Sequence, residues 1–180
     1  GDDYLISDPV AERSVTCPAE DLKRARFAKG PFAPHGLTYY PEYVPANPDL
    51  KGAVRDAIRT TAKRMTGIPM PFLGVRGIRW MAGKMERWPQ KLGPELARKW
   101  VSSVVRMQEE IGTGGAGFRF MYAAFLQEAS ELLANPALAE AARDLTATGD
   151  RWRDFAVQGA LLVKNRSNDP GAYKKLADIL

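Results

Sequence analysis

The sequence contains one cysteine, Cys17, and one histidine, His35, among its 180 residues. A single cysteine excludes an internal disulfide and every metal site built on several cysteines. A single histidine excludes the zinc sites that need two histidines. We therefore expect no bound metal, and no sequence pattern points to a cofactor.

Long apolar runs are also absent, since none approaches the ~20 residues that a helix needs to cross a bilayer. The chain opens with Gly1-Asp2-Asp3, which is acidic where a secretory signal would be basic. We therefore expect no membrane partner and a cytoplasmic location. The first residue is not Met, so either the translated protein starts upstream or a tag has been removed. The net charge of +5 permits an acidic partner without requiring one.

The first thirty residues predict two short strands followed by one helix. Tyr4–Ser7 and Ser14–Cys17 have the composition of strands. Pro18 fits a first helical position, and we expect the helix to end near Ala28. A hairpin this small is marginal in water and needs further strands that the sequence does not supply. Residues 1–30 are thus predicted to be the end of an incomplete N-terminal domain.

Residues 31–47 combine prolines with aromatic residues, notably Phe32, Tyr39, Tyr40 and Tyr43. A proline-rich spacer without aromatics would stay solvated. With its aromatics, this strap is predicted to pack against the body of the protein and to separate two domains.

Residues 48–180 have the 3.6-residue apolar period of helices. The expected class is therefore mainly α, a multi-helix bundle with a short N-terminal pair of strands. Expected helix signals are an N-cap at Asn47, ends at Gly67 and Pro89, starts at Pro94, Asn135 and Asp169, and a break at Gly149. The third helix is predicted to bury Leu96, Trp100, Val104, Met107 and Ile111.

Two residues are candidates for catalysis, and each has a simpler interpretation. Cys17 stands at a helix start, which lowers a thiol pKa, but a cysteine enzyme also needs a positioned histidine. Only His35 is available, so we interpret Cys17 as structural. Asp8 precedes a proline and fits a turn. The alternative is that Asp8 orients a catalytic histidine, as the third member of a triad does.

A glycine-rich segment over residues 112–117 leads directly into the fourth helix. Gly114, Gly115 and Gly117 allow backbone N–H groups to converge on an anion, and Arg119 and Tyr122 follow in the first turns. The simpler interpretation is a helix corner that needs positive φ values. A cation in the first turn conflicts with the helix dipole. We therefore expect an internal carboxylate beside Arg119, for example Glu128 or Asp154, or else a bound anion.

Four basic residues recur every fourth position on the first bundle helix: Lys51, Arg55, Arg59 and Lys63. Like charges at this spacing destabilise a helix by ~0.2–0.5 kcal/mol per pair. The row either meets acidic residues, binds an acidic partner or is simply solvated. No helix-turn-helix or other nucleic-acid motif accompanies it, so nucleic acid is not an expected partner.

Two stretches together resemble the butirosin biosynthesis protein H family, whose members join a papain-like cysteine domain to a helical C-terminal domain. The first stretch runs from Asp2 to Asp8 and from Val15 to Leu22, and the second is GGAGFRFMYAAFLQEA over residues 114–129. The resemblance implies a parent protein that transfers an acyl group through a cysteine, with an acidic acyl carrier protein as a possible partner. Asp8 matches the expected histidine-orienting acid, whereas Cys17 does not match the nucleophile.

We therefore expect a helical accessory domain of an acyltransferase or amidase that is not catalytic by itself. The alternative is a stand-alone helical module that binds a partner or associates with itself as a homo-oligomer.

Overall fold

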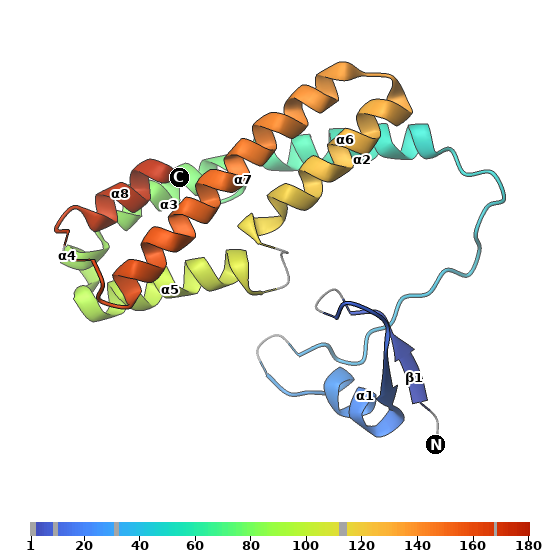
Figure 1. Cartoon of the computed structure of the whole chain (residues 1–180), viewed down its shortest axis with the longest axis horizontal. Helices are drawn as coiled ribbons and strands as arrows, with labels where there is room; N and C mark the ends of the chain where they lie inside the picture. Colours follow the sequence, from blue (N-terminus) through green and yellow to red (C-terminus); the bar gives the residue numbers. More distant parts are fainter. Residues whose placement is uncertain (1–2, 9–10, 31–32, 112–114, 168) are drawn as a thin grey trace. The chain divides into compact units, whose positions relative to one another are not determined.

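The structure of the protein, a computed structural model, describes residues 3–8, 11–30, 33–111, 115–167 and 169–180. The fold is mainly α, as predicted, with one antiparallel pair of strands at the start of the chain (Figure 1). The chain divides into two units, residues 1–48 and residues 49–180. Each unit is described by itself.

The first unit contains strands β1 (Asp3–Ile6) and β2 (Val15–Pro18), followed by helix α1 (Ala19–Arg26). The strands pair antiparallel with Tyr4 opposite Cys17, which confirms the predicted strands to within a residue. Helix α1 ends two residues before the predicted Ala28. The chain folds back at this point, because Gly36 N–H donates to the Arg26 carbonyl at 2.8 Å and the Arg26 guanidinium donates to the Gly36 carbonyl at 2.6 Å.

The strap, residues 31–47, belongs to the first unit, and its packing against the helical unit stays a prediction. Tyr39, Tyr40 and Tyr43 are all exposed, and Phe32 lies outside the described residues. Closely spaced prolines hold this segment extended and remove backbone donors. Its aromatic side chains therefore gain little burial from the strap itself.

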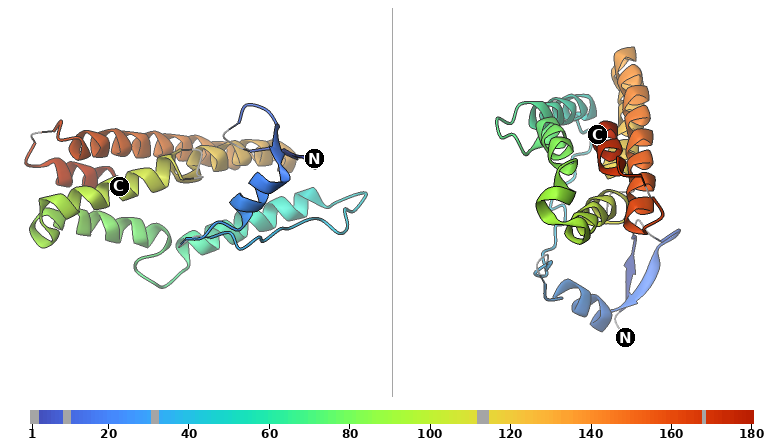
Figure 2. Two further views of the ribbon diagram at one scale, coloured as in Figure 1. Left: turned by 90° about the horizontal axis from the view of Figure 1, so that it is seen from below. Right: turned by 90° about the vertical axis from the view of Figure 1, so that its left-hand side faces the viewer.

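The second unit is built from helices alone. They are α2 (Leu50–Thr66), α3 (Gly74–Met85), α4 (Trp88–Leu92), α5 (Pro94–Glu109), the 3₁₀ turn η1 (Ala116–Phe118), α6 (Arg119–Leu133), α7 (Pro136–Val163) and α8 (Ala172–Ile179). Helices α6 and α7 form a long hairpin, α5 and α8 lie against α7, and α3 lies against α8 (Figures 1 and 2).

Several helix boundaries differ from the predictions for identifiable reasons. The N-cap of α2 is Asp49 rather than Asn47, because the Asp49 carboxylate accepts the Gly52 N–H at 2.9 Å. Pro89 does not end a helix but lies in the first turn of α4, where its missing N–H costs nothing. The starts at Pro94 and Asn135 and the end at Gly67 are confirmed.

Gly149 was predicted to break a helix, but α7 runs through it without interruption. The glycine serves packing instead, because a Cβ at this position would lie 2.7 Å from the ring of Phe120. It allows α6 to approach α7 closely. The last helix also starts later than predicted, at Ala172, after the Asp169 carboxylate accepts the Gly171 N–H at 2.8 Å.

The core of the second unit lies where α3, α5, α7 and α8 meet. Its largest fully buried side chains are Met85, Val101, Phe155 and Leu176. The predicted buried face of α5 is wrong by one position, since the helix buries Ala97, Val101 and Gln108. Gly159 of α7 explains which face of α5 is buried, because a Cβ at Gly159 would lie 2.7 Å from Val105. Small residues where α5 meets α7 allow the side of α5 that carries residues 97, 101 and 105 to face inward.

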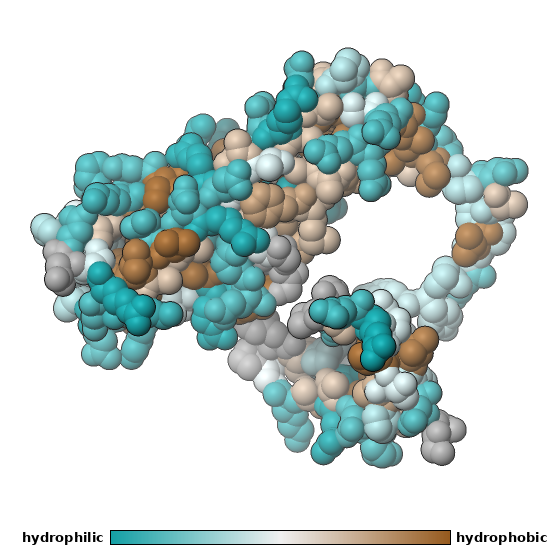
Figure 3. All heavy atoms as spheres, viewed as in Figure 1, coloured by the Kyte–Doolittle hydropathy of each residue, from teal (hydrophilic) through white to brown (hydrophobic). Residues whose placement is uncertain are grey.

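Large apolar side chains consequently remain on the surface of this unit (Figure 3). Four of them form a row along the exposed side of α5 and just beyond its end: Leu96, Trp100, Met107 and Ile111. Helix α2 has no buried residue at all. The second unit thus exposes large apolar side chains that do not pack into its own core.

Candidate functional site

The predicted basic row is exposed along its whole length. Lys51, Arg55, Arg59 and Lys63 all face solvent on α2, and Arg59 donates to the Asp56 carboxylate at 2.9 Å. An exposed pair of this kind contributes little to stability. The row is therefore a surface available to an acidic partner.

The glycine-rich corner has an unusual backbone. Gly115, Ala116, Gly117 and Phe118 have φ values of 86°, 48°, 58° and 67° in succession. Left-handed conformations suit glycine but cost Ala116 and Phe118 free energy. The structure thus supports the interpretation of Gly115 and Gly117 as residues required by a tight turn. Gly114, the remaining glycine of the predicted site, lies outside the described residues.

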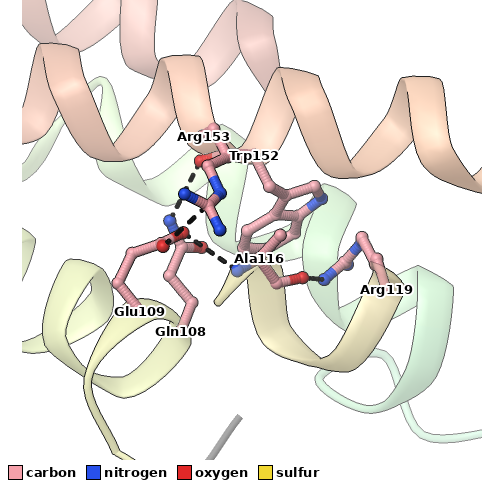
Figure 4. Close-up of polar contacts among 6 residues, drawn as sticks. All are labelled: Gln108, Glu109, Ala116, Arg119, Trp152 and Arg153. Carbon is pink, nitrogen blue, oxygen red and sulfur yellow. Dashed lines mark hydrogen bonds and ion pairs between the residues drawn. The ribbon is translucent and has the colours of Figure 1, made fainter. Parts of the chain in front are cut away.

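Contacts from α5 and α7 hold this corner in place (Figure 4). The Glu109 carboxylate accepts the Ala116 N–H at 3.0 Å, and its other oxygen lies 3.9 Å from Arg153 Nε. Beside it, buried Gln108 donates from Nε2 to the Trp152 carbonyl at 3.2 Å. Three helices therefore converge on the turn that starts α6.

Arg119 is stabilised by an aromatic ring rather than by the expected carboxylate. Its guanidinium carbon lies 3.8 Å from the centre of the Trp152 ring, and Nη1 donates to the Ala116 carbonyl at 2.9 Å. Partial burial lowers the Arg119 pKa. Within the described part of the chain, no carboxylate pairs with this cation, so Glu128 and Asp154 do not have the expected role. The face of an indole ring is an alternative source of negative potential.

Tyr122 is one turn further along α6 and stacks on Phe125 with 5.6 Å between ring centres. The arrangement brings Gly115, Gly117 and Arg119 together, with Tyr122 in a separate aromatic pair. Sequence reasoning missed Glu109 and Trp152. The sequence position of Glu109 could have indicated its role. An acidic residue at the C-terminal end of a helix conflicts with the helix dipole, as Arg119 does at the N-terminal end.

The catalytic candidates lie in the first unit. Asp8 follows β1, and its backbone carbonyl accepts the Ala11 N–H at 3.0 Å, as in a turn. Cys17 is partly buried in β2, and its thiol donates to the Pro18 carbonyl at 3.6 Å. His35 lines a surface hollow of about 320 Å³ with Phe27 and Lys29. The structure gives no contact between Cys17 and His35 over the residues that it describes.

Neither a membrane-spanning helix nor a candidate metal-binding group occurs among the described residues. No helix in residues 3–8, 11–30, 33–111, 115–167 or 169–180 is long and apolar enough to cross a membrane. No group of His, Cys, Asp and Glu side chains in the same ranges could hold a metal ion.

Comparison with known proteins gives one match. No curated protein and no solved structure matches the chain. A protein-family model does match, over residues 20–180, which include α1 except its first residue, the strap and the whole helical unit but neither strand. This match covers most of the sequence. The chain therefore belongs to the family described as "Domain of unknown function (DUF4872)".

Proposed function

We propose that this chain is the helical accessory domain of an acyltransferase or amidase similar to butirosin biosynthesis protein H, and that it binds a partner of the reaction rather than converting a substrate. The observation that carries this proposal is the β1–β2 hairpin. In the described residues its strands pair only with each other, and Leu5 is 76% exposed. A two-stranded sheet with exposed apolar residues is marginal in water. It suits the edge of a larger sheet, such as that of a catalytic domain.

The family match supports a boundary next to this hairpin. It begins at residue 20, two positions after β2 ends at Pro18. The match covers the helical unit and leaves out both strands. If the strands complete the sheet of a cysteine domain, Asp8 at the end of β1 would be the acid that orients its histidine.

The intact mass of the protein isolated from its own cells tests this proposal. We expect a mass well above the 19.9 kDa of this chain, with a cysteine and a histidine in the additional sequence. A native mass of 19.9 kDa would contradict the accessory role and favour the stand-alone module.

The partner that we propose for the basic row is an acidic acyl carrier protein. Opposite charges across an interface speed association and make it sensitive to salt. Reversing Arg55 and Arg59 to Glu should slow association at least tenfold and weaken its salt dependence. Because both side chains are exposed, circular dichroism should show an unchanged fold. Equal association of the variant and the parent would mean that the row is only solvated.

The outer row of α5 favours a second candidate, self-association. Trp100 is 52% exposed and Met107 is 64% exposed, at positions that repeat along one side of the helix. Sedimentation velocity should then show a dimer that Met107→Glu dissociates. Val157→Glu on α7 is the matched control, since Val157 is an equally exposed apolar residue outside this row. A monomer at all concentrations would exclude this candidate.

A further inference from the structure

The segment from α2 to α3 carries mostly positive charges. Between Asp56 and Glu86 the sequence has no acidic residue but six basic ones: Arg59, Lys63, Arg64, Arg76, Arg79 and Lys84. All six side chains are exposed. The chain as a whole has a net charge of only +5, so this segment concentrates positive charge on one part of the helical unit.

The loop between these helices, residues 67–73, exposes large apolar side chains. Met70 is 43% exposed, Phe72 is 56% exposed, and Leu73 is exposed beside them. Figure 2 shows this loop, between the teal and green helices, projecting beyond both helices in each view. Apolar residues at the tip of a projecting loop cannot be covered by the helices at its base.

The loop is held in a defined conformation. Gly74 has a φ of +59°, and a Cβ at this position would lie 2.3 Å from the Met65 carbonyl oxygen. A Cβ at Gly77 would lie 2.6 Å from the Phe72 carbonyl oxygen. The two glycines let the loop close tightly against its flanking helices. The exposure of Met70 and Phe72 therefore follows from the defined conformation of the loop.

The outward side of α3 continues this surface. Arg76, Arg79, Trp80 and Lys84 are all exposed, and the Lys84 ammonium lies 5.6 Å from the centre of the Trp80 ring. At the base of the loop, a hollow of about 470 Å³ is lined by residues that include Lys63, Arg64 and Ile68. Tryptophan surrounded by long cationic side chains is typical of the boundary between water and lipid.

We propose that this loop surface, defined as Arg64, residues 67–73, Arg76, Arg79, Trp80 and Lys84, binds the surface of an anionic lipid membrane. Met70 and Phe72 enter the headgroup region while the arginines contact lipid phosphates. The protein then lies on the bilayer without crossing it. This proposal differs from our expectation of no membrane partner, and it does not depend on the proposed role in acyl transfer.

The shape of the surface favours lipid over an acidic protein. A protein partner of ordinary affinity covers about 800 Å² on each side. A projecting tip offers a small area to a rigid partner, whereas a fluid bilayer closes around it. The exposed cations supply the complementary charge for an anionic leaflet, where each contributes roughly fivefold to affinity.

Co-sedimentation of the full chain with vesicles tests the proposal. We expect binding to phosphatidylcholine vesicles that contain 30% phosphatidylserine, and little binding to phosphatidylcholine alone. Met70→Ser with Phe72→Ser should weaken binding roughly tenfold or more, because their apolar area no longer enters the bilayer. Arg76→Glu with Arg79→Glu should weaken it by about 25-fold or more.

Matched variants elsewhere in the helical unit separate this surface from general effects. Val157→Ser with Leu161→Ser removes exposed apolar residues from α7, and Arg143→Glu with Arg166→Glu makes the same change in net charge. Both controls should bind like the parent chain. The proposal is overturned by absent binding to anionic vesicles or by equal losses in the controls. Binding to soluble polyglutamate with the same dependence on Arg76 and Arg79, but not to vesicles, would instead identify an acidic protein site.

Discussion

Arg119 occupies a helix position that is electrostatically unfavourable, and its surroundings compensate in two ways. The positive end of the α6 dipole repels a cation in the first turn. The Trp152 ring 3.8 Å away supplies negative potential, and the Ala116 carbonyl accepts a hydrogen bond. The guanidinium thereby ties the turn at residues 115–118 to α7. Its role in this structure is to hold the corner together.

Replacing Arg119 with Met should lower the free energy of unfolding by about 1–2 kcal/mol. Methionine keeps the aliphatic stem but loses the hydrogen bond to Ala116 and the cation–π contact, each worth roughly 1 kcal/mol. Urea unfolding measures the change, with exposed Arg143→Met as the control. A loss of 4 kcal/mol or more would indicate a buried carboxylate left without its partner.

Two glycines should respond in opposite ways to alanine. Gly83 is inside α3 with nothing within 4 Å of a Cβ, so Gly83→Ala should stabilise the protein by about 0.5–1 kcal/mol. Gly117 has a φ of +58°, and its Cβ would lie 2.9 Å from Arg119 Nη1. Gly117→Ala should destabilise by about 1 kcal/mol or more. Thermal unfolding of both variants measures these changes in stability. A gain in stability for Gly117→Ala would refute the left-handed turn.

At the scale of elements, the start of α8 depends on one carboxylate. Asp169 contacts Lys175 Nζ at 2.6 Å and accepts the Gly171 N–H at 2.8 Å. The hydrogen bond from Lys175, followed by that from Gly171, lowers the Asp169 pKa below its ordinary value of 3.8. A lowered pKa stabilises the fold at pH values above 3.8, and this stabilisation is lost as the pH falls below 3.8.

Asp169→Asn should therefore reduce the thermal unfolding midpoint at pH 7 and have a smaller effect at pH 2.5. The amide keeps the acceptor for Gly171 but loses the charge that pairs with Lys175. Melting curves of both chains at the two pH values measure the difference. Equal effects at pH 7 and pH 2.5 would show that the charge of Asp169 contributes nothing to the fold.

The elements also show what could be predicted from sequence. Capping residues and prolines predict the positions of most helices correctly, because their signals are local. Pro94 and Asn135, for example, begin α5 and α7 as expected. The buried side of α5 could not be predicted by periodicity, since apolar residues occupy two adjacent sides of that helix. Gly159 on a distant helix decided between them. The partner of Arg119 was missed for the same reason, because Trp152 is remote in sequence.

At the scale of the whole molecule, the two units differ in how much they bury. The helical unit has a core of fully buried side chains, such as Phe155 and Leu176. The described part of the first unit has no buried residue. Its hairpin is therefore held by the backbone pairing of β1 with β2 and by contacts with α1, without a buried core in the described residues.

We expect the hairpin to be the least protected structure of this chain against amide exchange. Amides of Tyr4 to Ile6 should exchange through local opening, many times faster than those of α7 around Phe155. Exchange followed by NMR on the monomeric chain measures both. Protection of Tyr4 to Ile6 equal to that of α7 in a monomer would mean that the hairpin needs no further strands, and would remove the main support for a missing sheet.

We propose that this chain binds a partner of acyl transfer without performing the transfer itself. Incubation with an acyl-pantetheine thioester, followed by intact-mass measurement, tests it most directly. We predict no covalent acyl group on the chain, and thioester loss at the same rate for the parent and for Cys17→Ala. An acyl adduct on Cys17 at neutral pH that disappears in His35→Ala would contradict the account, because it would show a working cysteine–histidine pair within these 180 residues.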